Sequence, residues 1–425
     1  MRKIWKEIAQ LFCQSSECRD WVLDFTLDSR RVKPGSLFFA LRGKNVDGHD
    51  FLNEIARQGA IGAIVSEDYR GPHFGLQLIR VKDVVQALHL LARGMIVKNL
   101  PYVIGVTGSV GKTTTKEFIA TLLSEKFSVA KNEGNMNSQV GLPLALLNWG
   151  GKEEVIVLEM GMSEAGEIKR LVDIASPDLG VLTHIDYQHS AFFNSLEEIA
   201  YAKSELFSSF KTKQGVLNLE TQGFKAIQEL PVSKIWFHLY DPYAHYSLCK
   251  LPIHAPFAES HIQENFLAAV SVARYFNLSW EEIDRGAKML KMPEHRFQKI
   301  EKGGVCFIDD SYNASPLSMK AALNNLPKGR RRIALLGMMR ELGFMQEVIH
   351  EEVGQCAVKV LDSLICVGRE CESMIKPFKK VGKEAVIFET KEEAAKHLKS
   401  MIQIGDVVLI KGSNRLKLWD IIEGI

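Results

Sequence analysis

Apolar runs recur along the whole chain and are separated from one another by polar or glycine-containing turns. In residues 1–85 these runs predict short strands at 22–27, 37–41, 60–65 and 76–81. A helical pattern follows from about Val84 to Val97, and the break Asn99-Leu100-Pro101 ends it. The pattern therefore predicts a small α/β N-terminal domain over residues 1–85, with a linking helix that extends to about residue 100.

Strand and helix patterns alternate through the remainder of the chain. In residues 101–298 apolar strands are expected at 102–106, 155–158 and 179–183. In residues 299–425 they are expected at 305–308, 333–336, 364–367, 385–388 and 407–410. Such alternation is typical of parallel sheets covered on both faces. The predicted fold class is α/β with three domains, the central one a parallel-sheet domain and the C-terminal one smaller and Rossmann-like.

Composition and charge argue against several classes of protein. The chain has 53 Lys and Arg against 51 Asp and Glu, so bulk charge indicates neither a nucleic-acid nor a membrane-surface partner. It has no apolar run of ~18 residues for a spanning helix and no continuous apolar stretch near Met1 for a secretory signal. The seven cysteines lack paired metal-site spacing, so we expect free, mostly buried thiols in a reduced, cytoplasmic setting. No apolar surface repeat is evident, and we expect a monomer.

The most specific motif is Gly108-Ser109-Val110-Gly111-Lys112-Thr113-Thr114-Thr115, which follows a predicted strand and opens a predicted helix. The backbone N–H groups of such a loop surround phosphate oxygens, and the helix N-terminus adds a favourable dipole. Lys112 would reach the β- and γ-phosphates, and Thr113 would offer a hydroxyl to Mg²⁺. A glycine turn capped by threonines is the alternative, and the strict pattern has glycine where this chain has Val106.

The strand-to-helix context favours the phosphate-binding alternative and a central domain of the P-loop type. The expected ATP contacts in this loop are Gly108, Ser109, Val110, Gly111, Lys112, Thr113 and Thr114.

Two further residues have positions that suggest chemistry. Glu159 ends the apolar run 155–158, and ligands of open parallel sheets gather at the carboxyl ends of strands. Metal binding by Glu159 is therefore favoured over an ordinary exposed residue after a strand. Lys203 falls on the apolar face of the helical stretch 196–207. It either reaches to the edge of that face or points into the site, charge-paired or chemically modified, and spacing leaves both open.

Together these residues resemble the Mur ligase family of peptidoglycan synthesis, in motifs spread from Asp28 to Ser413. The segment from Thr107 to Thr115 is similar to the family's nucleotide loop, which also lacks the first glycine. The resemblance implies a Mg²⁺ site formed by Thr113, Glu159, His189 and carbamylated Lys203, and catalytic roles for Lys112, Glu159, His189 and Lys203. Carbamylation would convert a buried cation into an anion able to bind Mg²⁺, which favours the functional interpretation of Lys203.

The resemblance extends toward both ends of the chain. Motifs containing Ser29, Arg30, Gly43 and His49 are similar to the family's UDP-sugar-binding domain, and Asn135 and Asn137 resemble its substrate loop. His261, Asn265 and Arg296 correspond to ATP-contacting positions. The chain departs from the family pattern at Ser138, His184, Ile262, His295 and Met338.

Two motifs in the last segment are close to signatures of the family branch that adds D-alanyl-D-alanine. They are Asp309-Asp310-Ser311-Tyr312-Asn313-Ala314-Ser315-Pro316, in which Asn313 is an expected ATP contact, and Gly337-Met338-Met339-Arg340-Glu341-Leu342-Gly343. Some of these residues also have simpler interpretations. His189 could be an ordinary loop residue, Asn313 could be a turn former, and Asp309 and Asp310 could only cap the following helix.

The resemblance implies an ATP-dependent ligase that adds D-alanyl-D-alanine to UDP-N-acetylmuramoyl-tripeptide through an acyl-phosphate, with Mg²⁺ as cofactor and closure of the domains over the site. One alternative is a sibling ligase that adds the third amino acid or extends folate with glutamate. The Asp-Asn-Pro-type motif of the third-residue sibling is not found in the sequence. The other alternative is a P-loop switch or transport ATPase, which would need neither a sugar-binding domain nor a lysine at the site.

Overall fold

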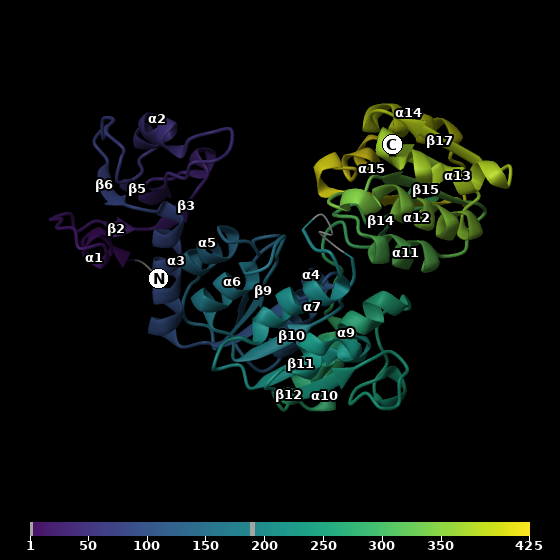
Figure 1. Cartoon of the computed structure of the whole chain (residues 1–425), viewed down its shortest axis with the longest axis horizontal. Coiled ribbons are helices and arrows are strands. Elements are labelled where there is room, and N and C mark those ends of the chain that lie inside the picture. The colour runs from purple at the N-terminus through teal and green to yellow at the C-terminus, as the bar shows by residue number, and fades with distance from the viewer. Residues whose placement is uncertain (1–2, 188–191) are drawn as a thin grey trace.

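The computed structural model describes residues 3–187 and 192–425, which form three α/β domains in chain order (Figure 1). The first and last sheets lie on either side of the central part of the molecule (Figure 1). The expected α/β fold class with three sheet-containing regions is confirmed. No helix in the described part of the chain combines the length and apolarity that a membrane span requires.

The first domain is built on a four-stranded parallel sheet in the order β3-β4-β5-β6. Its strands and helices, with a preceding antiparallel pair, are β1 (Lys3–Ile4), α1 (Trp5–Leu11), β2 (Trp21–Val22), β3 (Asp24–Thr26), β4 (Ser36–Phe39), α2 (Leu52–Arg57), β5 (Gly62–Ser66) and β6 (Gln77–Val81). Helix α3 (Val84–Asn99) follows, where the Asp83 carboxylate accepts from the N–H groups of Val85 and Gln86. It ends at Leu100, which is left-handed before Pro101.

The central sheet has six parallel strands in the order β12-β11-β10-β7-β9-β8. Its elements are β7 (Tyr102–Thr107), α4 (Lys112–Leu123), β8 (Val129–Lys131), α5 (Gly141–Asn148), β9 (Val155–Glu159), α6 (Glu167–Ala175), β10 (Leu179–Leu182), α7 (Leu196–Ser204), β11 (Gln214–Asn218), α8 (Lys225–Gln228), β12 (Ser233–Phe237), α9 (Ser260–Tyr275) and α10 (Trp280–Lys288).

Alternate side chains of the central strands are buried on opposite faces of the sheet. On β7, Ile104 packs with α4 and α9, whereas Val103 packs with α3, α5 and α6. Because both faces are covered, β7, β9 and β10 are apolar at nearly every position instead of at every second one. This is why the sequence predicted these three strands, whereas it missed the inner strand β11, which begins with Gln214 and Gly215.

The third sheet also has six strands, in the order β13-β14-β18-β15-β16-β17. Its elements are β13 (Gln298–Lys302), β14 (Val305–Asp309), α11 (Pro316–Asn324), β15 (Arg332–Gly337), α12 (Gln346–Val360), β16 (Ser363–Val367), α13 (Glu372–Lys380), β17 (Glu384–Phe388), α14 (Lys391–Met401), β18 (Val407–Lys411) and α15 (Asp420–Gly424). Buried side chains of α11, α12 and α13 cover one face, and those of α14 and α15 cover the other.

Two expectations from the sequence, one about the third sheet and one about the cysteines, need correction. The edge strand β13 is antiparallel and joins β14 through Gly303 and Gly304, which have φ of +59° and +76°. Its mostly polar sequence gave no signal of a buried strand. All seven cysteines lie in the described part of the chain and are free, but only Cys366 and Cys371 are buried, so the expectation of mostly buried thiols is wrong.

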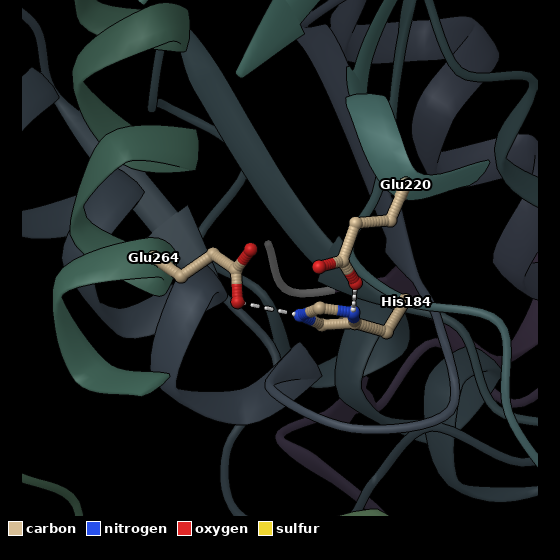
Figure 2. A group of neighbouring side chains, drawn as sticks. All are labelled: His184, Glu220 and Glu264. Atoms are coloured by element: carbon tan, nitrogen blue, oxygen red, sulfur yellow. Dashed lines mark hydrogen bonds and ion pairs between the residues drawn. The ribbon is translucent and has the colours of Figure 1, made fainter. Parts of the chain in front are cut away.

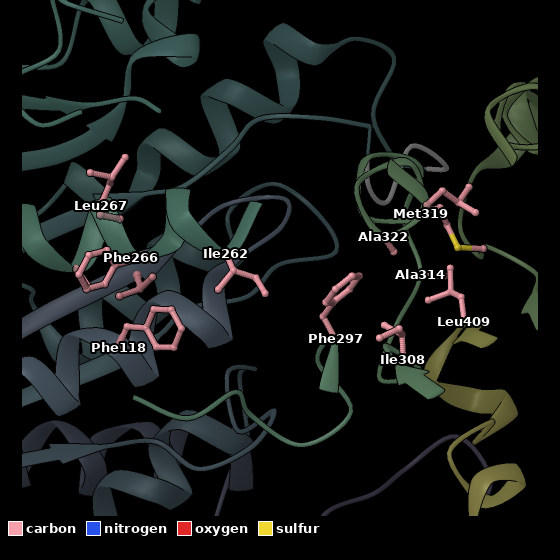
Figure 3. Packing of buried hydrophobic residues seen from close by; sticks show 14 of the residues in the cluster. Phe118, Ile262, Phe266, Leu267, Phe297, Ile308, Ala314, Met319, Ala322 and Leu409 are labelled. Carbon is pink, nitrogen blue, oxygen red and sulfur yellow. The ribbon is translucent and has the colours of Figure 1, made fainter. Parts of the chain in front are cut away.

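One buried cluster continues from the central domain into the C-terminal one (Figure 3). Phe118 of α4 and Phe266 of α9 belong to its central part, and Ile308 of β14 to its C-terminal part. Phe297, in the linker before β13, lies between these two groups (Figure 3). The linker is therefore packed into the core where the C-terminal domain meets the central domain.

Candidate active site

A cavity of about 520 Å³ opens at the carboxyl ends of the central strands, against the C-terminal domain. Its walls come from the loop before α4, from the ends of β9 and β10, from α9 and from the segment after β14. The lining residues predicted from the sequence are Ser109, Val110, Gly111, Lys112, Thr113, Thr114, Asn135, Asn137, Glu159, His261, Asn265, Arg296 and Asn313. Most of the predicted site thus converges on a single cavity.

The loop between β7 and α4 requires glycine at two positions. Gly108 has φ of +150°, and a Cβ there would lie 1.9 Å from the Thr183 hydroxyl oxygen. Gly111, at the N-terminus of α4, has φ of +81°, and a Cβ there would lie 2.2 Å from Asn265 Oδ1. Val106 is instead a buried residue inside β7, which explains why the chain needs no glycine at that position.

Lys112 folds back over this loop. Its Nζ donates to the carbonyl oxygens of Gly108 at 2.8 Å and Ser109 at 3.2 Å. Burial lowers the pKa of Lys112 to about 8. The negative charge of Glu159 raises this pKa, and the positive charge of Arg296 lowers it further. A desolvated cation at the start of a helix is suited to pair with phosphate oxygens.

Glu159 is the last residue of β9 and is only 2% exposed, so the alternative of an ordinary exposed residue is wrong. Its carboxylate accepts from the Thr113 hydroxyl at 2.8 Å and from the Asn137 amide at 2.6 Å. A carboxylate and a hydroxyl beside the phosphate loop are the hard oxygen ligands that Mg²⁺ prefers. These two residues therefore fit a Mg²⁺ site.

Lys203 lies on α7 and is 2% exposed, so it does not reach to the edge of the helix face. Burial and the neighbouring charge of Lys112 hold the pKa of Lys203 well below its usual range. The surroundings thus disfavour an ammonium at this position. His189, the other expected ligand, lies outside the described residues.

The predicted ATP contacts in α9 and beyond surround the loop. Asn265 accepts from the Thr115 hydroxyl at 3.2 Å. The half-buried His261 ring packs edge-on against Phe297 with centroids 5.0 Å apart, and desolvation lowers the pKa of His261. Arg296 donates to the Thr113 hydroxyl oxygen at 3.2 Å. Side chains from α9 and from the linker therefore meet at the phosphate loop.

The cavity does not include the residues predicted for the UDP-sugar. Ser29, Arg30, Gly43 and His49 lie in the first domain and do not line it. Both ring nitrogens of His49 are already engaged, Nδ1 with the Asp47 carboxylate at 2.6 Å and Nε2 with the N–H of Ser66 at 3.0 Å. Arg30 is exposed and pairs with Asp28 through two hydrogen bonds.

Asp309 and Asp310 do not cap the following helix, so that simpler interpretation is wrong. The Ser315 hydroxyl caps α11 by accepting from the N–H of Ser318. Asp310 instead forms an ion pair of 2.6 Å with the buried Lys411. Burial lowers the pKa of Lys411, while the Asp310 carboxylate opposes this effect.

Sequence reasoning missed a charged cluster in the cavity wall (Figure 2). The His184 ring lies between the carboxylates of Glu264, on α9, and Glu220, after β11 (Figure 2). Nε2 is 2.8 Å from the Glu264 carboxylate, and Nδ1 is 3.5 Å from that of Glu220. Asn218 donates to Glu264 at 2.9 Å. Since His184 and Glu264 are 80 residues apart, no local pattern could have paired them.

Among the described residues, His184, Glu220 and Glu264 are the one group of three His, Cys, Asp or Glu side chains whose ligand atoms all lie within 4.8 Å of one another. Burial alone would lower the pKa of His184, but the bonds and charges of Glu220 and Glu264 outweigh it and raise the pKa to about 10. At neutral pH the ring is therefore a cation that bridges two carboxylates. The protonated His184 ring already supplies a positive charge between the two carboxylates of this cluster. Thr113 and Glu159 are therefore the better fit for Mg²⁺.

The His184 ion pairs predict a pH-dependent stability. His184→Asn leaves the buried Glu264 carboxylate without its charge partner, which should cost roughly 3 kcal/mol of unfolding free energy near pH 6. The pKa of His184 is raised from 6.5 to about 10 on folding. This stabilisation is therefore fully present below about pH 6.5 and is lost as the pH rises through about 10. Urea denaturation of wild type and variant at about pH 6 and about pH 10.5 measures it.

The matched control is His254→Asn, which changes an exposed histidine of the same domain. Its effect on the unfolding free energy should be small at both pH values. A destabilisation by His184→Asn that stays constant over this range would contradict the ion pairs.

Three family models match the chain in order. They are "Mur ligase family, catalytic domain" over residues 25–95, "Mur ligase middle domain" over 106–273, and "Mur ligase, glutamate ligase domain" over 295–414. The boundaries of these matches place the phosphate loop and Glu159 in the middle domain and Asn313 in the last one.

Characterised relatives match along nearly the whole chain. The UDP-N-acetylmuramoyl-tripeptide–D-alanyl-D-alanine ligase of Bacillus subtilis is 31% identical, over 94% of this chain and 92% of its own length. The MurF structure from Acinetobacter baumannii is 25% identical with a TM-score of 0.87, over 99% of this chain and 98% of that one. The structure of the MurF ligase of Thermotoga maritima in complex with ADP is 30% identical with a TM-score of 0.78. The match covers 95% of this chain and 96% of that one.

Proposed function

The chain belongs to the Mur ligase family, and on this basis we propose that it joins D-alanyl-D-alanine to UDP-N-acetylmuramoyl-tripeptide in an ATP-dependent reaction. The observation that carries the proposal is the meeting of the phosphate loop, Glu159 and Asn313 in one cavity between two domains. The names of the full-length relatives support the same substrates. The product is a precursor of peptidoglycan, and the reaction serves cell wall synthesis.

The reaction proceeds in two steps. The terminal carboxylate of the tripeptide attacks the γ-phosphorus of ATP, and the bond to the ADP oxygen breaks to give an acyl-phosphate. The amine of D-alanyl-D-alanine then attacks the acyl carbon, loses a proton and displaces inorganic phosphate. The loop N–H groups and Lys112 bind the phosphates and offset the charge that develops on the transferring group.

Mg²⁺ would be held by Thr113, Glu159, His189 and carbamylated Lys203, and would supply Lewis-acid stabilisation of the phosphoryl group. The geometry at Thr113 and Glu159 supports this assignment, because their oxygens are already 2.8 Å apart beside the loop. Carbamylation of Lys203 forms a bond from Nζ to the carbon of CO₂ and releases a proton. A buried amine whose pKa lies well below its usual range is the nucleophile that this step needs.

The three domains divide the remaining tasks. Residues 1–85 bind the UDP-sugar, with Ser29, Arg30, Gly43 and His49 in or near that subsite, and residues 101–298 bind ATP. Residues 299–425 close over the site and exclude water from the acyl-phosphate. Asn135 and Asn137 hold the peptide end of the acyl substrate, which their position on the cavity wall supports. We expect the enzyme to act as a monomer in the cytoplasm.

Phosphate release in the presence of ATP and Mg²⁺ tests this function. We expect release only when both UDP-N-acetylmuramoyl-tripeptide and D-alanyl-D-alanine are present, with one pentapeptide product formed for each phosphate. L-Lysine or L-glutamate in place of D-alanyl-D-alanine should give no product. Release that is indifferent to both acceptors would overturn the proposal in favour of a P-loop switch, and ligation of glutamate to folate would favour the sibling branch.

A further inference from the structure

The linker between α10 and β13 contains two left-handed residues that are not glycine. His295 has φ of +57° and Phe297 has φ of +51°, and they flank Arg296. For residues with a Cβ this conformation costs about 1 kcal/mol or more each. Such strain persists only where surrounding contacts hold it in place.

Among the described residues, the contacts of His295 go to Gln298 at the start of β13 and to the C-terminal domain. Its Nδ1 lies 2.7 Å from the Asp309 carboxylate, and its ring stacks on Trp419 with centroids 4.9 Å apart and planes inclined by 18°. Its N–H donates to the Gln298 side chain at 2.8 Å, and its carbonyl accepts from the N–H of Tyr312 at 3.2 Å. Backbone and side chain together fix this residue to the domain that follows it.

Phe297 is fixed in the same way on the other side of Arg296. Its N–H donates to the Asp310 carboxylate at 3.1 Å, and the other carboxylate oxygen of Asp310 pairs with Lys411. Its ring is buried between the two parts of the core that Figure 3 shows. The two residues that flank Arg296 thus contact adjacent aspartates at the end of β14.

The Arg296 side chain contacts both the C-terminal domain and the phosphate loop. Its guanidinium lies over the Tyr312 ring, 4.0 Å from the centroid, and donates to the Thr113 hydroxyl oxygen of the phosphate loop. Arginine binds phosphate oxygens through paired N–H groups in a fixed plane, so its orientation decides how well it can do so.

We propose that His295 is a positioning residue that holds Arg296 toward the nucleotide phosphates through its contacts with Asp309 and Trp419. The strained backbone at His295 directs the Arg296 side chain at the loop, and the ring contacts keep that backbone from relaxing. This inference rests on ATP binding at the loop and is independent of which amine the enzyme uses.

A double-mutant cycle on nucleotide affinity tests the proposal. His295→Gly should weaken ATP binding about tenfold, measured by calorimetry, because glycine frees the backbone and removes both ring contacts. In an Arg296→Ala background the same change should weaken binding less than about twofold, since its effect passes through Arg296. The KM for ATP should rise in His295→Gly with a smaller change in kcat. His295→Asn, which tolerates the left-handed backbone and keeps a hydrogen-bonding side chain, should recover part of the affinity.

Asn277→Gly is the matched control, because Asn277 is exposed and left-handed with φ of +56° in the central domain. It should leave ATP affinity unchanged, and thermal unfolding should show that all variants are folded. Equal losses of affinity from His295→Gly in both backgrounds, or no loss in either, would overturn the proposal. Because binding is measured without acceptors, a failure of ligation alone would count against the proposed function and not against this inference.

Discussion

Lys112→Ala is expected to reduce the rate of ligation by at least about a thousandfold while leaving the chain folded. The amine is folded over the phosphate loop by bonds to Gly108 and Ser109, and it offsets charge on the transferring phosphoryl group. Because burial already lowers the pKa of Lys112 to about 8, its removal deletes a desolvated charge and should not lower the melting temperature. Ligation rates and thermal unfolding of the same preparation measure both effects.

Lys126→Ala serves as the control for this variant, since Lys126 is an exposed lysine just beyond the other end of α4. Its ligation rate should lie within about twofold of wild type. A Lys112→Ala enzyme that retains more than a tenth of the wild-type rate would remove Lys112 from the mechanism.

Lys203→Met should also abolish ligation, again by about a thousandfold or more, and should leave stability unchanged or raise it. Methionine fills a similar volume without a polar group, and burying an ammonium is costly. Activity is expected to fall because the carbamate, and with it a charged ligand of Mg²⁺, cannot form. In ¹³C-labelled bicarbonate, wild-type protein should give a carbamate carbon signal in the NMR spectrum that the variant lacks.

The variant Lys203→Arg tests whether activity requires the carbamate or only a positive charge at this position. Arginine keeps a cation at this position but cannot form the carbamate, so its activity should be as low as that of Lys203→Met. An active Lys203→Arg enzyme, or a wild-type spectrum without the carbamate signal, would contradict carbamylation.

The parts of the fold that sequence predicted are those where burial leaves a local signal. Strand β9 is apolar throughout because helices cover both faces of its sheet. Strand β13, at a sheet edge, is mostly exposed and polar, and β11 begins with Gln214 and Gly215, so neither has the same pattern. Exposure and position in the sheet, more than intrinsic strand preference, decide what the sequence reveals.

Site residues could likewise be predicted only where the sequence carries a local signal. Lys112 and Thr113 could be predicted because the loop is continuous in sequence, and Glu159 because it ends an apolar strand. The His184 cluster could not, because its members come from three elements that only the fold brings together. His49 was assigned to the UDP-sugar subsite by resemblance and stays a prediction, and its ring nitrogens are held by Asp47 and Ser66 of its own domain. Contacts between residues far apart in the sequence could not be predicted from local sequence patterns.

The most direct test of the central claim follows the oxygen atoms of the acyl substrate. UDP-N-acetylmuramoyl-tripeptide labelled with ¹⁸O in its terminal carboxylate is incubated with ATP, Mg²⁺ and D-alanyl-D-alanine, and the released phosphate is analysed by mass spectrometry. An acyl-phosphate route transfers one labelled oxygen to each phosphate, and this is the predicted result. Unlabelled phosphate would mean that water attacks ATP directly, and would contradict the account.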